Sequence, residues 1–166
     1  MYIYIADSRN NKIKYVDTEG LIHTLVGTGE TGDRAGVLSK WCTLNKPKGV
    51  FAQDAGTMNQ VVYIADTFNH KVKFLNTSGI VYDFIGNGTA AITNTTLNLP
   101  TGLYNIGNFL FISDKSSIRA YDKVAHNLIL LAGNEANGYN QNNIQANAAL
   151  LDYPLHLSVV PSPNDD

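Results

Sequence analysis

An aspartate recurs three times along this chain in closely similar surroundings. Asp7, Asp66 and Asp114 each follow a short apolar run, at spacings of 59 and 48 residues. Carboxylates that meet in space could hold a divalent metal ion. An aspartate that closes a strand can instead accept backbone N–H groups in the turn that follows. Because the residue recurs together with its surroundings, we expect the three aspartates to be structural repeat positions and not one shared site.

The histidines and the single cysteine show no metal-binding spacing. His23, His70, His126 and His156 form no HExxH or comparable motif, and Cys42 has no CxxC companion. We therefore expect no metal ion and no other cofactor. Cys42 cannot form a disulfide within the chain, so it gives no indication of the redox compartment, and we expect a structural thiol.

A glycine-rich stretch of the chain superficially resembles a phosphate-binding loop. The run GTGETGDRAG, from Gly27 to Gly36, lacks the Lys-Ser/Thr of a phosphate-binding loop and opens no helical pattern. The sequence contains no GxSxG, and no Ser/His/Asp or Cys/His set can be assembled from it. We therefore predict no catalytic residue.

The composition is that of one globular domain. The chain has 166 residues, of which 44% are hydrophobic and 16% charged, with a formal net charge of −2. This apolar fraction excludes wholesale disorder, and the slightly negative charge argues against binding of nucleic acid through a positive surface. No apolar run reaches the roughly 18 residues of a membrane span, and the start MYIYIADSRNNK has no signal-peptide pattern. The compartment is not indicated.

Three markers occur three times in the same order, which identifies an internal repeat. The first marker is the apolar run ending in the aspartates named above. The second is a glycine that closes an apolar pair, at Gly27, Gly86 and Gly133. The third is a proline within LNKPKGV, LNLPTGL and LDYPLHL, at Pro47, Pro100 and Pro154.

Each repeat predicts four short β-strands. The run before the aspartate is apolar at alternating and at intervening positions, so this strand should be covered on both faces of its sheet. The next strand alternates, as in Val72-Lys73-Phe74-Leu75, and we expect its lysines to point outward. A turn with a terminal glycine leads to a third strand, and the proline marker opens a fourth. Ile144–Leu151 favours one or two helical turns.

Repeated four-stranded sheets with both faces covered are typical of β-propeller blades. The pattern resembles the NHL-repeat family. The residues that carry the resemblance are Pro47-Lys48-Gly49-Val50, YIADTFNHKV from Tyr63, the turn Asn76–Gly79 and Phe84-Ile85-Gly86-Asn87-Gly88. The third repeat departs from the pattern, because two residues are missing between Asp114 and Ile118 and His156 replaces the glycine found at Gly49 and Gly102.

The resemblance implies an all-β fold of about three antiparallel blades, half of a six-bladed ring whose proline strand is innermost. We expect blades at 1–43, which lacks its innermost strand, at 44–96 and at 97–150, followed by a donated innermost strand at 151–160 and a polar tail at 161–166. Some relatives are metal-dependent lyases with histidines at the propeller centre. His156 is the one histidine predicted on an innermost strand, so it is the one candidate for such a metal ligand.

The leading hypothesis for function is a non-catalytic propeller that binds another protein through loops between blades. The polar loops Thr28–Thr43 and Asn134–Ala149 are the predicted contact surfaces, and Asn11 and His70 are predicted turn residues. The alternative is a metal-dependent lyase or lactonase-like enzyme with a central site. Asn76, Asn87 and Asn94 lie in glycosylation acceptor motifs, whose number is what chance alone supplies.

Three blades leave two open ends, with unpaired strand edges and uncovered apolar faces. We therefore expect a larger assembly. Either two copies of the chain join about a two-fold axis, or a different subunit or further chain completes the ring. Neither nucleic acid nor membrane is an expected partner.

Overall fold

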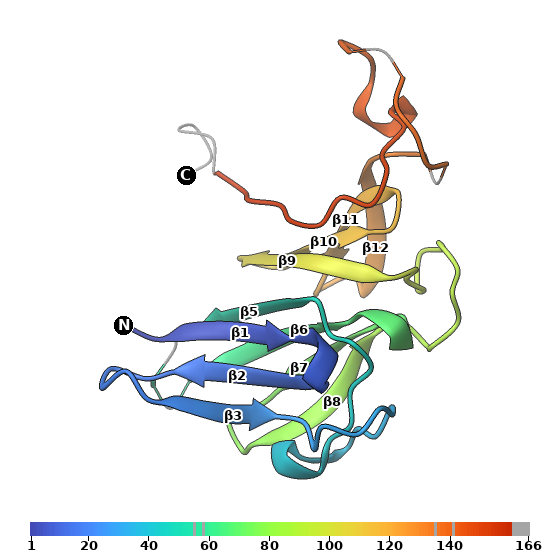
Figure 1. The fold of residues 1–166 in the computed structure, drawn as a ribbon. Helices are drawn as coiled ribbons and strands as arrows, with labels where there is room; N and C mark the ends of the chain where they lie inside the picture. The colour runs from blue at the N-terminus through green and yellow to red at the C-terminus, as the bar shows by residue number, and fades with distance from the viewer. Residues whose placement is uncertain (55, 58, 135, 141, 161–166) are drawn as a thin grey trace.

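The computed structural model describes residues 1–54, 56–57, 59–134, 136–140 and 142–160, and within these ranges the chain forms three antiparallel sheets (Figure 1). The first sheet contains β1 (Ile3–Asp7), β2 (Lys12–Val16) and β3 (Ile22–Val26). The second contains β4 (Val37–Leu38), β5 (Gly49–Gln53), β6 (Val61–Asp66), β7 (Lys71–Leu75) and β8 (Ile80–Ile85). The third contains β9 (Pro100–Ile106), β10 (Phe109–Asp114), β11 (Ser117–Asp122) and β12 (Asn127–Ala132).

The all-β prediction is confirmed, and the sheets are stacked like blades around an axis. The second and third sheets begin with the proline strands β5 and β9, which pair with β6 and β10. Short 3₁₀ turns follow β1 and β6, at Ser8–Asn10 and Thr67–Asn69, with others at Ser39–Trp41 and Ala146–Ala148. The last of these lies within the segment where helical turns were expected.

Two apolar layers lie between neighbouring sheets. The layer between the first and second sheets consists of Ile13, Val26, Cys42, Leu44, Val62, Ile64, Leu75 and Val81. The layer between the second and third sheets consists of Tyr63, Ala65, Val72, Ile85, Leu97, Leu103, Leu110, Ile112 and Leu128. Successive residues of β6, such as Tyr63 and Ile64, therefore bury opposite faces of one strand, as the doubly apolar sequence predicted.

The innermost strands of neighbouring sheets pack at backbone distance. A Cβ added at Gly49 of β5 would collide with the carbonyl oxygen of Thr101 in β9. The hydroxyl of Thr67 donates to the carbonyl of Pro100 at 2.8 Å, which fixes the start of β9 against the second sheet. Glycine at position 49 therefore allows the close approach of two blades near the axis.

The segment 151–160, expected as a donated innermost strand, runs extended beside β9 toward the C-terminus (Figure 1) and pairs with no strand among the described residues, so its donation to another blade stays a prediction. One expectation was wrong. Lys73 does not point to solvent but is fully buried, because a loop from the preceding sheet covers it. In addition, β4, which was not foreseen, pairs with β8 of the second sheet although it lies in the range of the first blade. None of the helices in the described residues could span a membrane.

The second marker glycine occupies a tight corner in each repeat. Gly27, Gly86 and Gly133 have positive φ angles of 107°, 88° and 88°. A Cβ at any of them would meet the carbonyl oxygen of the residue that precedes the second strand of its own sheet: Asn11, His70 and Ser116. Both the left-handed backbone and the lack of space therefore require glycine there.

We predict that Gly86→Ala lowers the free energy of unfolding by about 3 kcal/mol, because strain and a backbone clash add. The matched control is Gly20→Ala, whose φ of 85° is nearly the same but whose added Cβ would meet nothing within 4 Å. The control should lose about 1 kcal/mol, the usual cost of the left-handed conformation. Chemical denaturation measures both, and equal losses would contradict the role of the close contact.

Candidate functional site

The repeated aspartates lie in separate sheets, and Asp66 and Asp114 accept backbone N–H groups. Asp66 accepts the N–H of Asn45 at 2.7 Å, and Asp114 accepts the N–H of Asn98 at 2.6 Å. Asn45 and Asn98 stand two residues before the prolines that open β5 and β9. These bonds therefore hold the approach to the innermost strand, and Asn69 in the turn after β6 also donates to Asp66 at 2.7 Å. In the first sheet Asp7 contacts the amide of Asn10 at 2.9 Å and Lys14 at 3.2 Å.

A second set of side chains holds the same approach from the neighbouring sheet. Asn11 and His70 both adopt left-handed backbone, with φ of 52° and 54°. The side chain of Asn11 accepts the N–H of Lys46 at 2.9 Å, and that of His70 accepts the N–H of Leu99 at 3.2 Å. Asn11 and His70 are thus turn residues, as predicted, and they also fasten each blade to the next.

An ionic cluster around the buried Lys73 joins the first two sheets. The ammonium group of Lys73 lies 2.6 Å from Asp33 and 2.6 Å from Asp83, and 3.6 Å from Asp66. Lys71 contacts Asp33 at 2.6 Å and Asp83 at 2.7 Å. Burial opposes the charge of Lys73, yet its bonds to Asp33 and Asp83 hold its pKa above the ordinary value. Asp33 belongs to the loop Thr28–Thr43, so part of this predicted binding loop is structural.

The third sheet carries a cation at the corresponding place. Arg119 of β11 is 3% exposed and donates to the carbonyl of Thr96 at 2.6 Å and to that of Thr93. Thr93 and Thr96 belong to the loop that precedes β9. At both interfaces between neighbouring sheets, therefore, the loop from the preceding sheet supplies oxygen atoms to a cation, which lies on β7 in the second sheet and on β11 in the third.

The axis of the stack is hollow. A cavity of about 370 Å³ is bordered by β1, β5 and β9 and by the segment that contains His156. His156, the candidate metal ligand, lies against Gly102 on this cavity. Within the described residues, no three His, Cys, Asp or Glu side chains are grouped so as to hold a metal ion. Cys42 is fully buried between the first two sheets, and burial raises the pKa of its thiol to about 12.

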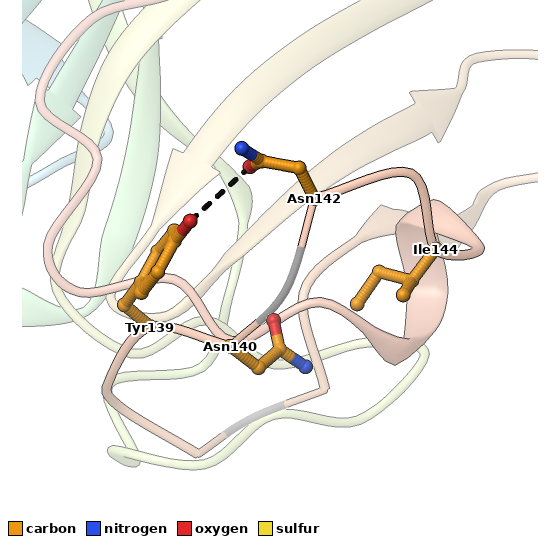
Figure 2. A pocket seen from close by; sticks show the side chains of 4 residues that line it. All are labelled: Tyr139, Asn140, Asn142 and Ile144. Carbon is orange, nitrogen blue, oxygen red and sulfur yellow. Dashed lines mark hydrogen bonds between the residues drawn. The ribbon is translucent and has the colours of Figure 1, made fainter.

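The loop Asn134–Ala149 forms the other large hollow. Its volume is about 600 Å³, and Tyr139, Asn140, Asn142 and Ile144 line it (Figure 2). The hydroxyl of Tyr139 points to the side-chain oxygen of Asn142 at 3.4 Å. Asn140 donates to the carbonyl of Ala148 and accepts the N–H of Leu150, so this amide is engaged in holding the loop. The hollow is wide and open to solvent.

An exposed aromatic surface was missed by the sequence interpretation. Phe68, in the 3₁₀ turn after β6, is 42% exposed. The ammonium groups of Lys46 and Lys48 lie 5.0 and 5.7 Å from the centre of its ring. We call these three residues the Phe68 surface. The signal for it was an aromatic residue inside the polar turn TFNH, where no strand requires one.

We predict that Lys73→Met lowers the free energy of unfolding by about 1–3 kcal/mol, since it removes the cation next to the buried Asp66 and leaves the partly exposed Asp33 and Asp83 with Lys71 alone. Methionine keeps most of the aliphatic volume, so the loss reports the charge. Lys40→Met, at an exposed lysine, should stay within about 0.5 kcal/mol of the parent chain. Thermal or urea unfolding measures both changes, and a stable Lys73→Met chain would contradict the role of the cluster.

A pH effect should arise from Asp66, whose pKa burial raises to about 6. A carboxyl with a raised pKa holds its proton more tightly in the folded chain, so its contribution to stability is lost as pH rises from about 4 through about 6. Asp66→Asn has no carboxyl group and avoids this loss. Relative to the parent chain, the free energy of unfolding of the variant should therefore rise by roughly 1–3 kcal/mol between pH 4 and pH 7, as measured by urea unfolding. A trend of opposite sign for Asp66→Asn would refute the prediction.

No family model matches the chain, but curated relatives do. It is 41% identical over 75 residues to NHL repeat-containing protein 2 of Gallus gallus, 40% to that of Bos taurus and 37% to that of Homo sapiens. The matched part is 45% of this chain and spans 10% of the length of each relative.

Solved structures share the fold. A protein of unknown function from Bacteroides thetaiotaomicron matches with a TM-score of 0.65 at 15% identity, over 93% of this chain and 38% of that one. An auxiliary nutrient binding protein from Bacteroides ovatus matches with a TM-score of 0.55 at 17% identity, over 76% of this chain and 33% of that one. The curated relatives support an NHL-repeat family for the matched part of this chain, and its antiparallel sheets are consistent with β-propeller blades.

Proposed function

We propose that this chain is a non-catalytic scaffold that binds another protein through the Phe68 surface. The observation that carries the proposal is an exposed phenylalanine whose ring is contacted by the ammonium groups of two lysines. Exposed aromatic residues supply much of the energy of protein interfaces, and their cost in conformational entropy is low.

The backbone around Phe68 is fixed before any partner binds. Its N–H donates to the carbonyl of Asn45 at 3.1 Å, and Asn69 beside it donates to Gly32 and to Asp66, both at 2.7 Å. A preformed surface loses little entropy on binding. The two ammonium groups favour a partner segment that brings a carboxylate next to an apolar side chain.

The predicted contact loop Thr28–Thr43 adds further exposed apolar residues. Trp41 is 55% exposed, with the ammonium group of Lys40 5.4 Å from its ring centre, and Leu38 beside it is 46% exposed. These residues lie on the part of the loop Thr28–Thr43 that is not engaged in the ionic cluster. They support the same kind of function, a protein contact made by loops between blades.

The experiment compares proteins retained from cell extract by the immobilised chain and by the double variant Phe68→Ser/Lys48→Ser. The matched control is Tyr82→Ser, which removes an aromatic residue of similar exposure, 43%, from β8. We expect a partner that the parent chain and the control retain and that the double variant loses, with thermal midpoints alike. A partner retained equally by all three, or no specific partner, would overturn the proposal.

A further inference from the structure

A small pocket lies between the first two sheets, at the end opposite the Phe68 surface. Its volume is about 190 Å³, and it is lined by Tyr2, Tyr4, Tyr15, Leu25, Gly56 and Gln60. We call these six residues the tyrosine pocket. Gln60 directly precedes β6, whereas Phe68 follows it. The structure describes both sheets that border the pocket, and Tyr4 and Leu25 pack on the apolar layer between them.

The pocket arises because this interface has shorter side chains than the interface between the second and third sheets. Leu25 of β3 stands at the strand position that Phe84 of β8 has in the next repeat. Leu75 of β7 likewise stands where Tyr121 of β11 does one repeat later. The ring of Phe84 lies 5.3 Å from those of Tyr63 and Tyr121, centre to centre, and fills the space between its two sheets. Leucine at both positions leaves that space open in the first interface, so the pocket is a departure from the repeat.

The tyrosine hydroxyls of the pocket are available to a ligand. The hydroxyls of Tyr121 and Tyr139 contact neighbouring side chains, at 3.2 and 3.4 Å. Those of Tyr2, Tyr4 and Tyr15 form no hydrogen bond within the part of the chain that the structure describes. Burial raises the pKa of the Tyr4 hydroxyl, and the neighbouring phenols add to this, so the group keeps its proton and can donate at neutral pH.

Gln60 adds a further donor, and the pocket has no charge. The carboxamide oxygen of Gln60 accepts the N–H of Gly56 at 3.1 Å, and its nitrogen forms no hydrogen bond among the described residues. None of the described residues that line the pocket is ionised at neutral pH. Aromatic and aliphatic walls with several donors and no counter-ion suit a neutral ligand that is rich in hydrogen-bond acceptors.

The aromatic wall of the pocket is held in place before a ligand binds. On the central strand β2, Tyr15 lies between Tyr4 of β1 and His23 of β3. Its ring is close to parallel with both, at centre distances of 6.2 and 5.0 Å. His23 in turn contacts the carboxylate of Asp17 at 2.6 Å. A preformed aromatic surface of this kind loses little entropy on binding.

The volume of the pocket limits the size of the ligand. Pockets for drug-sized molecules and cofactors enclose roughly 300–1,000 Å³, so the tyrosine pocket admits only a short stretch of a partner chain. A segment in the polyproline II conformation matches the other features. Its proline rings are apolar and rigid, and its carbonyl groups have no hydrogen-bond partner within the segment. Aromatic-lined grooves are the usual docking sites of such segments.

We propose that the tyrosine pocket binds a proline-rich segment of a partner protein in the polyproline II conformation. The rings of Tyr4 and Tyr15 contact the proline rings, and the hydroxyl groups and the amide of Gln60 donate to the carbonyls of the segment. This site goes beyond the proposed function and lies apart from the Phe68 surface.

The first test is a calorimetric titration of the chain with decaproline, for which we expect a dissociation constant in the micromolar to millimolar range. Leu25→Phe fills the pocket with the residue that the next interface carries, and it should weaken binding roughly tenfold or more. The matched control is Leu21→Phe, the same change at a leucine that is 55% exposed and does not line the pocket. Circular dichroism checks that both variants fold. A parent chain that does not bind decaproline, or equal binding by the parent chain and Leu25→Phe, would overturn the proposal.

The second test removes one hydroxyl and keeps its ring. Tyr4→Phe should weaken the binding of decaproline about fivefold, the effect of one lost hydrogen bond, whereas Tyr82→Phe on β8 should not. An unchanged affinity of Tyr4→Phe, or a pocket that binds the neutral sugar maltotriose and not decaproline, contradicts the proposal. The double variant Phe68→Ser/Lys48→Ser should bind decaproline as the parent chain does, so the two proposals fail separately.

Discussion

Each blade of this chain is apolar on both faces, so it is stable only between neighbours. This constraint explains why the strongest contacts run between sheets. The side chains of β6 bury Ile64 toward the first sheet and Tyr63 toward the third, and a single blade could cover neither. The same constraint places Gly49 against the backbone of β9, because innermost strands must approach closely around an axis.

Hydrogen bonds as well as apolar packing hold neighbouring sheets together. The approach to each innermost strand is bound from two sides, by the aspartate of its own blade and by the left-handed residue of the preceding one. Next to these hydrogen bonds lies a buried cation, Lys73 or Arg119, which the loop from the preceding sheet covers. This loop contacts Lys73 through a carboxylate and Arg119 through backbone carbonyls. The requirement is therefore for buried oxygen partners, and loops of different sequence can meet it.

Much of the fold could be predicted because it repeats. The strands, the marker glycines and the proline strands β5 and β9 follow from local patterns of period two and from turn residues. The burial of Lys73 could not be predicted, since alternation within one strand does not show that a distant Asp33 will cover it. The segment 151–160 carries a strand-like pattern, but a strand also needs a ladder partner, and the pattern does not supply one.

The candidate site was less predictable than the fold. The repeated aspartates were expected to be structural, yet their bonds reach across the chain to Asn45 and Asn98, positions that spacing alone does not connect. The Phe68 surface depends on Lys46 and Lys48, which are distant in sequence from the turn that they flank. Function in a propeller depends on such loop contacts, whereas the repeat pattern mainly reports the blades.

The central claim is that every blade of this chain requires a neighbour on both faces. Amide hydrogen exchange of the parent chain tests it most directly. The account predicts that β6 and β7, whose sheet lies between two others, are the best protected strands, and that β2 and β11, whose sheets have one neighbour each among the described residues, exchange faster. Equal protection of the middle strands of all three sheets would contradict the claim.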